Sequence, residues 1–336
     1  MLYPHSKDEK LEKSLFENPG SEYRCAPFWA WNCKLEEDEL LRQIEIFHEM
    51  GFGGFHMHVR TGMDTEYLSD EFMHLIRSCT DKAKSEKMLA CRDEAEKNHM
   101  LCWLYDEDRW PSGAAGGLVT RDRRYAARYL LFTPTPYGQG EKSTVTTSQS
   151  VGARQENGTL LAQYRVTLKD GCLAHYERVQ NGAPHEDGMW YAYLEISAPS
   201  PWYNNETYLD TLNPKAVEKF VATTHERYKE ALGESFGKTV PAIFTDEPQF
   251  SRKQTLGFAG EKKDVTLPFT NDLCETYQAA YGEDLLDKLP ELIWELPEGR
   301  ISVTRYHYHD HIAERFSSAF ADTVGGWCGK NGIMLT

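Results

Sequence analysis

The sequence predicts an α/β fold built on a parallel β-sheet, with an antiparallel β-rich segment inserted into it. Short apolar runs alternate with helical segments from residue 28 onward, and this strand–helix–strand order is typical of a parallel sheet. The order breaks at residues 129–199, which are rich in Thr, Val, Tyr and Gly, and then resumes. The length of 336 residues allows one large barrel domain or two smaller domains.

Three apolar runs in the first part of the chain are expected to be strands, and a helix follows each of the first two. In the first helix, Leu40, Ile44 and Phe47 recur at helical spacing, acidic residues crowd the first turn, and Gly51 ends the helix. The second helix begins at Ser69. The expected strands are 28–32, 52–58 and 100–105, and the first expected helix is 35–47.

A short tandem duplication precedes the third strand. Residues 79–90 are echoed by residues 91–102, with Cys, Asp, Ala, Met and Leu at identical offsets. About 12 residues is not a whole number of turns at 3.6 residues per turn, so we expect local distortion. Because the second copy joins directly to the strand, we assign the strand to it and expect the first copy to lengthen the preceding helix or to bulge out.

The segment 129–199 has the features of an antiparallel insertion, with an alternating stretch and turn signals. The α/β order then resumes, with Asn213 as N-cap and Pro214 at the first position of a helix that runs to about residue 232. The remaining expected elements are a strand at 240–245, helices at 271–281 and 304–330, and the opening of a strand at 333–336.

The composition excludes several classes of partner. Lys and Arg total 37 and Asp and Glu total 52, so the formal net charge is −15. Nucleic acid and anionic membranes select a basic face, so neither partner is expected. No apolar run approaches the roughly 20 residues of a membrane helix. The polar start of the chain does not have the features of a signal peptide, so we expect a cytoplasmic protein whose eight scattered cysteines are reduced and mostly buried.

The residues that follow the expected strands are the candidates for chemistry, because residues just past the carboxyl ends of the strands line the active site of a parallel α/β barrel. Carboxylates, tryptophans, histidines, an asparagine and arginines gather there. This mixture suits sugars, since flat rings cover the apolar faces of pyranoses while carboxylates and amides pair with hydroxyls. The substrate-binding candidates are Trp29, Trp31, Asn32, His56, His58, Arg60, Tyr105, Asp106, Glu107, Asp108, Trp110 and Asp210.

Several candidates also have a structural interpretation. Trp29 and Trp31 either form platforms on which a sugar ring stacks or pack inside the barrel. His56 and His58 are expected to alternate, one pointing inward and the other away. The acidic run 106–108 binds hydroxyls or a cation, or else forms a solvated turn; its position directly after five apolar residues favours a functional role.

Asp246 and Glu247 are the catalytic candidates. They follow the apolar run 240–245 and precede Pro248, and an acid directly after a buried strand is costly to leave without a role. Paired carboxylates flanking a bond are also what glycoside hydrolysis requires. Other chemistries are poorly supported, because the sequence shows no Gly-x-Gly-x-x-Gly after a strand, no P-loop and no Gly-x-Ser-x-Gly elbow.

Four segments occur in a recognisable order: Pro-Phe-Trp-Ala-Trp-Asn at 27–32, Gly-Phe-Gly-Gly-Phe-His-Met-His at 51–58, Trp-Leu-Tyr-Asp-Glu-Asp-Arg-Trp-Pro-Ser-Gly at 103–113 and Phe-Thr-Asp-Glu-Pro at 244–248. Together they resemble large bacterial glycoside hydrolases related to glycoside hydrolase family 106, the α-L-rhamnosidase type. The resemblance spans about residues 23–336, and the segments are more specific for the superfamily than for the substrate.

The resemblance implies a (β/α)8 TIM-type barrel, here N-terminal and incomplete, followed by β-sandwich domains in a longer chain. It implies an inverting mechanism with glutamates as acid and base. It implies no cofactor for the chemistry itself and admits a Ca²⁺ ion near the sugar. Only Glu247 is carried over, and its partner is expected on a later strand. The predicted domains are an extension at 1–22, the first part of the barrel at 23–128, the β-rich insertion at 129–199 and the barrel continuation at 200–336.

The sequence therefore predicts a bacterial glycoside hydrolase that acts on a plant or microbial polysaccharide, with an α-L-rhamnoside as the substrate that the resemblance suggests. About six parallel strands are expected where a closed barrel has eight, so we expect the fragment to be inactive without further domains of the same chain. The alternative is a non-catalytic carbohydrate-binding barrel or an inactive fragment. A second carboxylate within about 10 Å of Glu247 would favour hydrolysis. Asp106, His58 and Glu247 are expected to converge at one barrel mouth.

Overall fold

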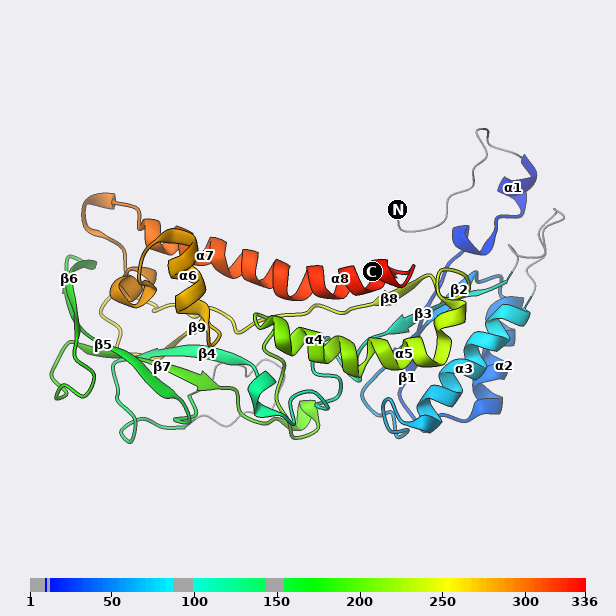
Figure 1. Cartoon of the computed structure of the whole chain (residues 1–336), viewed down its shortest axis with the longest axis horizontal. Helices are drawn as coiled ribbons and strands as arrows, with labels where there is room; N and C mark the ends of the chain where they lie inside the picture. Colours follow the sequence, from blue (N-terminus) through cyan, green and yellow to red (C-terminus); the bar gives the residue numbers. More distant parts are fainter. Residues whose placement is uncertain (1–9, 11–12, 87–98, 143–153) are drawn as a thin grey trace. The chain divides into compact units, whose positions relative to one another are not determined.

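The fold is described from a computed structural model of the chain, which describes residue 10 and residues 13–86, 99–142 and 154–336. The chain divides into two units, each drawn from separate stretches of sequence (Figure 1). The parallel unit comprises Met1–Gly116, Glu218–Pro248 and Thr323–Thr336, and the antiparallel unit comprises Gly117–Val217 and Gln249–Asp322.

A five-stranded parallel sheet forms the centre of the parallel unit. The strand order β1-β2-β3-β8-β10 is also the order in the sequence, and every neighbouring pair is parallel. Helical segments separate the strands along the chain, because each parallel connection must cross back to the start of the next strand. The strands are β1 Phe28–Trp31, β2 Gly54–Val59, β3 Leu101–Tyr105, β8 Ala242–Phe244 and β10 Met334–Leu335.

The predicted combination of a parallel and an antiparallel sheet in a mixed α/β chain is confirmed. Where about six parallel strands are expected, the described residues contain five, and each is formed by one of the expected apolar runs. These five strands form an open sheet, and the part of the chain that the structure describes contains no closed barrel.

Local sequence signals determine the helices that follow β1 and β2. Helix α2 Glu37–Glu49 has three acidic residues in its first turn, which stabilise the positive end of the helix dipole. Helix α3 Asp70–Ser85 begins after Ser69, whose Oγ accepts a hydrogen bond from the amide of Phe72 at 3.1 Å. The two helices pack side by side (Figure 1).

Helix α3 includes residues 79–85, so the first copy of the duplication lengthens the helix over these positions. Residues 87–98, which hold most of the rest of the duplication, lie outside the described residues. Strand β3 begins within the second copy, at Leu101.

Two long helices expected from the sequence are each divided. Asn213 accepts a hydrogen bond from the amide of Lys215 at 3.1 Å and so caps the expected helix, but the helix breaks at Thr224 into α4 Pro214–Thr223 and α5 His225–Leu232. The Thr224 hydroxyl donates to the carbonyl of Phe220, which also accepts the Thr224 amide at 3.0 Å, and a hydroxyl bonded back in this way often bends a helix. The later helix is divided into α7 Val303–Phe316, a π-helical turn Ser317–Ala321 and α8 Asp322–Lys330.

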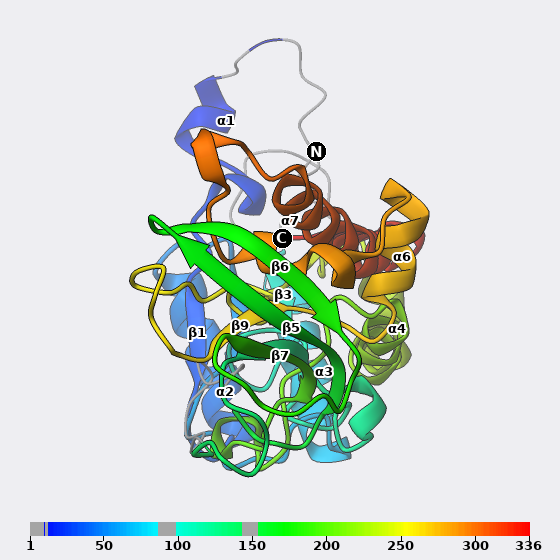
Figure 2. The ribbon, with the colours of Figure 1, turned by 90° about the vertical axis from the view of Figure 1, so that its left-hand side faces the viewer.

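A five-stranded antiparallel sheet forms the centre of the antiparallel unit (Figure 2). Its order is β6-β5-β7-β4-β9, and every neighbouring pair is antiparallel. Four strands come from the expected insertion, whereas β9 comes from the chain after β8. The strands are β4 Arg128–Thr133, β5 Thr159–Lys169, β6 Cys172–Val179, β7 Met189–Ile196 and β9 Val265–Pro268.

The antiparallel unit is larger than the predicted insertion at 129–199, because residues 249–322 group with it. One face of its sheet packs on the helical segments of that stretch, with Phe132 and Trp190 at 5.1 Å and Trp190 and Trp294 at 5.0 Å between ring centroids. These segments are α6 Leu273–Tyr281, the 3-10 helix η6 Leu285–Leu292 and α7. They were expected in the barrel continuation, but they cover the apolar face of the antiparallel sheet.

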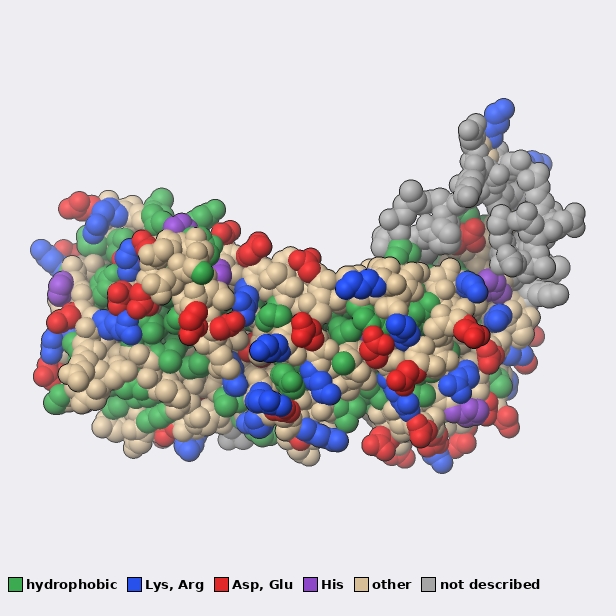
Figure 3. Space-filling model, in the orientation of Figure 1, with side chains coloured by type: hydrophobic (Ala, Val, Ile, Leu, Met, Phe, Trp, Pro, Cys, Tyr) green, Lys and Arg blue, Asp and Glu red, His purple; other side chains and the backbone are tan. Residues whose placement is uncertain are grey.

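The surface carries charges of both signs, and the cysteines are less buried than expected. Acidic and basic side chains are interspersed over helices α3 and α5 (Figure 3). No helix among the described residues is both long enough and apolar enough to span a membrane. Of the seven cysteines among the described residues, Cys79, Cys102 and Cys328 are buried, Cys172 and Cys274 are half-buried, and Cys25 and Cys33 are exposed in segments that flank β1, so fewer than half are fully buried where most were expected to be.

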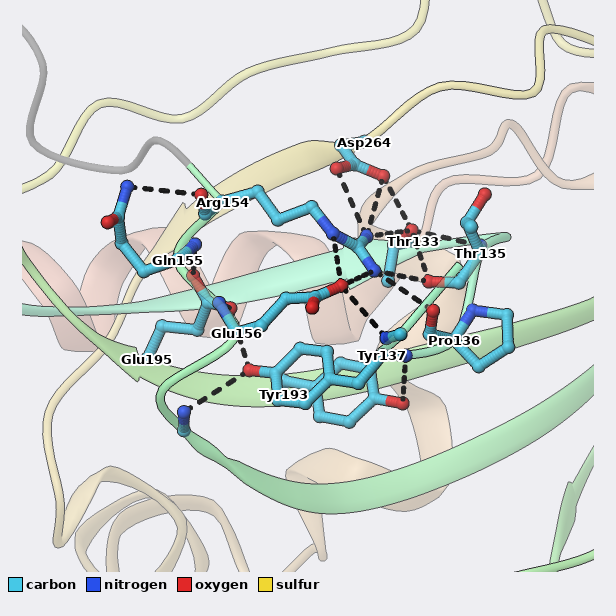
Figure 4. Close-up of polar contacts among 12 residues, drawn as sticks. Thr133, Thr135, Pro136, Tyr137, Arg154, Gln155, Glu156, Tyr193, Glu195 and Asp264 are labelled. Atoms are coloured by element: carbon cyan, nitrogen blue, oxygen red, sulfur yellow. Dashed lines mark hydrogen bonds and ion pairs between the residues drawn. The ribbon is translucent and has the colours of Figure 1, made fainter. Parts of the chain in front are cut away.

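A buried arginine connects three segments of the antiparallel unit (Figure 4). Arg154 Nη1 lies 3.3 Å from Asp264 Oδ2, and Nη2 lies 2.8 Å from Glu156 Oε1. Nη2 also donates to the carbonyl oxygens of Thr135 and Pro136. A charge buried this deeply is tolerated because acceptors surround the guanidinium group.

A buried glutamate lies in the same region (Figure 4). Glu195 accepts hydrogen bonds from the hydroxyls of Tyr129 and Tyr137 and from the amides of Gln155 and Glu156, at 2.6–2.8 Å. All four donors point at its two oxygens, so this carboxylate ties the segment before β5 to the face of β4 and β7.

Replacing Arg154 by Met is expected to destabilise the protein by about 2–4 kcal/mol, because it leaves two partly buried carboxylates and two carbonyl oxygens without their donor. The matched control is Arg165→Met, which also removes an arginine paired with two carboxylates, Glu177 and Glu186. The Arg165 side chain is 46% exposed against 3% for Arg154, so the control is expected to lose at most about 1 kcal/mol. Urea unfolding of both variants measures the difference, and equal losses would contradict the interpretation.

Candidate active site

Successive side chains along each strand of the parallel sheet point to opposite faces, and helices cover one of these faces. The opposite face, called the open face below, is exposed at Phe28 of β1, whereas His58 of β2 and Tyr105 of β3 are buried on it. Trp29 and Trp31 point toward the helices. The Trp29 indole donates to Gln43 Oε1 at 2.7 Å, and the Trp31 ring lies 5.9 Å from the ring of Phe72. Both tryptophans are buried, so the structure places them in the packing between sheet and helices, the second of their two interpretations.

The open face carries an aromatic group that sequence analysis did not select. Phe28 is 59% exposed, and its ring lies within 5.2 Å of the rings of His56, His58 and Phe244. The alternation of side chains along a strand could have predicted this position, because Phe28 is next to Trp29 in β1 and must face the opposite side. An exposed ring on this face can cover the apolar face of a sugar.

The expectation that His56 and His58 point to opposite faces is wrong, because residues two apart on a strand share a face. His56 stacks on Trp103 at 4.8 Å, and His58 lies 4.2 Å from the ring of Tyr105. Arg60 Nη1 lies 3.3 Å from His58 Nε2. Burial lowers the pKa of both histidines, to about 4 for His58, so both are neutral near pH 7.

Glu107 organises the loop after β3. Its two oxygens accept hydrogen bonds from four backbone amides at 2.6–2.9 Å, while its side chain is fully buried. Burial raises the pKa of Glu107, and the amide donors oppose that rise because they favour the ionised form. With both oxygens engaged, Glu107 holds the loop and is unsuited to binding a hydroxyl or a cation. The donors are Asp108, Gly113, Ala115 and Gly116.

The two acids beside Glu107 are also buried, so the interpretation of this run as a solvated turn is wrong. Asp106 Oδ1 accepts the Ser112 hydroxyl at 2.5 Å, and Oδ2 lies 3.8 Å from His225 Nε2. Burial raises the pKa of Asp106 to about 7 and lowers that of His225 to about 3. Asp108 Oδ2 pairs with Arg109 at 3.0 Å.

Asp246 and Glu247 follow β8 and meet the loop after β3. Ser112 donates its amide to the carbonyl of Asp246 at 2.9 Å, and its hydroxyl oxygen accepts the Asp246 amide at 2.9 Å. Trp110 Nε1 donates to Glu247 Oε2 at 3.0 Å. Burial and the neighbouring Glu247 raise the pKa of Asp246, and Arg60 opposes that rise. Glu247 is exposed, so its carboxylate is accessible from solvent.

The structure thus brings many of the predicted residues to the carboxyl edge of one parallel sheet. Ser112 bridges Asp106 and Asp246, which is next to Glu247 in the chain, while Asn32 is exposed just after β1. Asp210 belongs to the antiparallel unit, where it is buried and accepts the Thr270 hydroxyl at 2.6 Å.

The calcium ion that the resemblance admits finds no matching donor set in the described residues. No group of three or more His, Cys, Asp or Glu side chains has the arrangement of a metal site in that part of the chain. The acidic run after β3 does not supply one, because backbone amides engage both oxygens of Glu107.

Comparison with known proteins supports the fold alone. No protein-family model and no curated protein matches the chain. Among solved structures, the chain is similar to a rhamnosidase from Novosphingobium sp. PP1Y, with a TM-score of 0.53 and 12% sequence identity. The match covers 97% of this chain and 47% of that one, so the chain spans about half the length of the rhamnosidase. The chain thus has a fold similar to the matched half of that rhamnosidase.

Replacing Glu107 by Gln is expected to destabilise the protein by about 2–6 kcal/mol. The amide nitrogen of Gln cannot accept, so two of the four buried backbone donors lose their acceptor, at about 1–3 kcal/mol each. Glu71→Gln, at an exposed position of α3, is the control and is expected to change stability by less than about 0.5 kcal/mol. If urea unfolding gives both variants the same stability, Glu107 does not hold the loop.

Asp210 makes stability depend on pH. Burial raises its pKa to about 7 in the folded protein, so between about pH 4 and pH 7 the unfolded chain loses this proton while the folded protein keeps it. Its contribution is therefore complete below about pH 4 and falls by about 1.4 kcal/mol per pH unit up to pH 7. Asp210→Asn is expected to remove this component from the pH dependence of the unfolding free energy.

The control for that measurement is Asp170→Asn, at an exposed turn between β5 and β6 of the same unit. Its unfolding free energy is expected to follow the wild-type curve from pH 4 to pH 8. If the unfolding free energy of Asp210→Asn has the same slope against pH as that of the wild type, the Asp210 carboxyl titrates with an ordinary pKa.

Proposed function

We propose that the chain carries part of the catalytic domain of a glycoside hydrolase that acts on a plant or microbial polysaccharide, with α-L-rhamnosides as the first substrates to test. The observation that carries the proposal is the position of Glu247. Its exposed carboxylate follows a buried strand at the carboxyl edge of a parallel sheet, where β/α enzymes place their chemistry. The fold likeness to a rhamnosidase and the resemblance of four sequence segments support the same class.

Glycoside hydrolysis by inversion uses one carboxylic acid to protonate the leaving oxygen and one carboxylate to activate water, about 6.5–9.5 Å apart. In this proposal Glu247 is one of the two. Asp246 is its neighbour in the chain, and its raised pKa reflects burial and the charge of Glu247. The proposed partner carboxylate lies on a later strand of the barrel, and Asp246 supports Glu247.

A second candidate function is sugar binding without hydrolysis, which the exposed ring of Phe28 favours. This ring and the neutral, half-buried His56 give the open face an apolar surface with a polar edge. Such a surface can hold a pyranose ring whether or not a pair of carboxylates is present.

Glu247→Gln separates the two functions when it is made in the full natural protein. The amide keeps the shape of the side chain but cannot exchange a proton, so turnover of an aryl α-L-rhamnoside, or of whichever aryl glycoside a screen identifies, is expected to fall about 10²–10⁴-fold. Sugar binding, measured by calorimetry, is expected to survive.

The control is Glu49→Gln, at the exposed end of α2, which is expected to keep wild-type turnover. Turnover of Glu247→Gln close to that of wild type would remove Glu247 from the catalytic role. Binding of sugars by a wild-type protein that hydrolyses no aryl glycoside would favour the binding function.

A further inference from the structure

The loop after β3 fixes the backbone on which Glu247 stands. Both backbone groups of Asp246 bond to Ser112, at 2.9 Å each, and the Ser112 hydroxyl in turn donates to the buried Asp106 at 2.5 Å. The residue before Glu247 is therefore tied to a neighbouring strand end. Its position depends on a loop that is itself held by the four amide bonds of Glu107.

Glu247 itself has an unfavourable backbone conformation. Its φ is +43°, in the left-handed region that non-glycine residues rarely adopt, and it precedes Pro248, which favours an extended conformation for the residue before it. Such residues persist where surrounding contacts impose them, and they cluster at functional sites. In this conformation, Glu247 Oε2 accepts the indole N–H of Trp110 at 3.0 Å.

We propose that Trp110 is a positioning residue for Glu247, and this inference rests on the proposed catalytic role of that glutamate. The indole N–H fixes Oε2, so the second oxygen, Oε1, is the one presented to the reacting bond. Trp110 therefore acts through the edge of its ring. This differs from the sugar platform predicted for Trp110 from the sequence, which would act through the face of the ring.

Two substitutions distinguish a role of the N–H edge of the Trp110 ring from a role of its face. Trp110→Phe keeps an aromatic face and removes the N–H, whereas Trp110→Ala removes both. A positioning role predicts that both variants lose kcat to a similar extent, by about 10–100-fold, with KM within about twofold, since a misplaced catalytic group costs about that much. A platform role predicts nearly normal kinetics for Phe and a raised KM for Ala, and that result would overturn the proposal.

The matched control is Trp327→Phe. The Trp327 indole also donates to a carboxylate, Glu226 Oε1 at 2.6 Å, but this pair joins helices α8 and α5 of the same unit. The substitution removes an equivalent hydrogen bond from the structural part of the unit, and it is expected to leave kcat within about twofold. A loss of kcat equal to that of Trp110→Phe would show that any lost indole–carboxylate bond has this effect.

A second measurement does not depend on activity. The indole N–H of Trp110, assigned in ¹H–¹⁵N spectra by its disappearance in Trp110→Phe, is expected to shift upfield in ¹H in Glu247→Ala, because its acceptor is gone. The Trp327 indole signal is the internal reference. An unmoved Trp110 signal overturns the positioning role even if the protein is an active glycosidase. A shifted signal in a protein without glycosidase activity overturns the proposed function and leaves the contact established.

Discussion

The candidate active site depends on the hydrogen bonds that one buried carboxylate, Glu107, accepts from its own loop. Four amides of that loop point inward, and without Glu107 they would lack acceptors in a region that water does not reach. The loop so formed presents Trp110 and Ser112 to the end of a neighbouring strand. Glu107, whose engaged oxygens make it unsuited to binding substrate, therefore helps to hold the proposed catalytic Glu247 in place.

The elements of the parallel unit could be predicted because each carries a local signal. Apolar runs mark its five strands, and Ser69 marks a helix start. The orientation of the side chains was predicted less well, because a position near a strand end does not reveal which face the helices cover. Trp29 and Trp31 lie on the covered face and Phe28 on the open one. Strict use of the two-residue period would have placed His56 and His58 together.

Features that depend on distant partners could not be predicted. The role of Glu107 could not be predicted, because its partners are backbone amides and these do not depend on the type of side chain. Asp210 follows the expected insertion and was assigned to the barrel continuation, yet it lies in the antiparallel unit, where Thr270 donates to it. Strand β9 is a run of four residues whose partner β4 is distant in the sequence, so no local pattern assigns it to that sheet.

The pairing of β9 with β4 has a consequence for the order in which the protein is made. Synthesis proceeds from the amino terminus, so β4, β5, β6 and β7 leave the ribosome well before β9, and α4, α5 and β8 emerge between them. Until β9 arrives, one edge of β4 has unpaired backbone groups, and the helices that cover the apolar face of this sheet have not yet been made. During this interval the nascent chain is most exposed to pairing with another chain, and a pause in translation here would prolong that exposure.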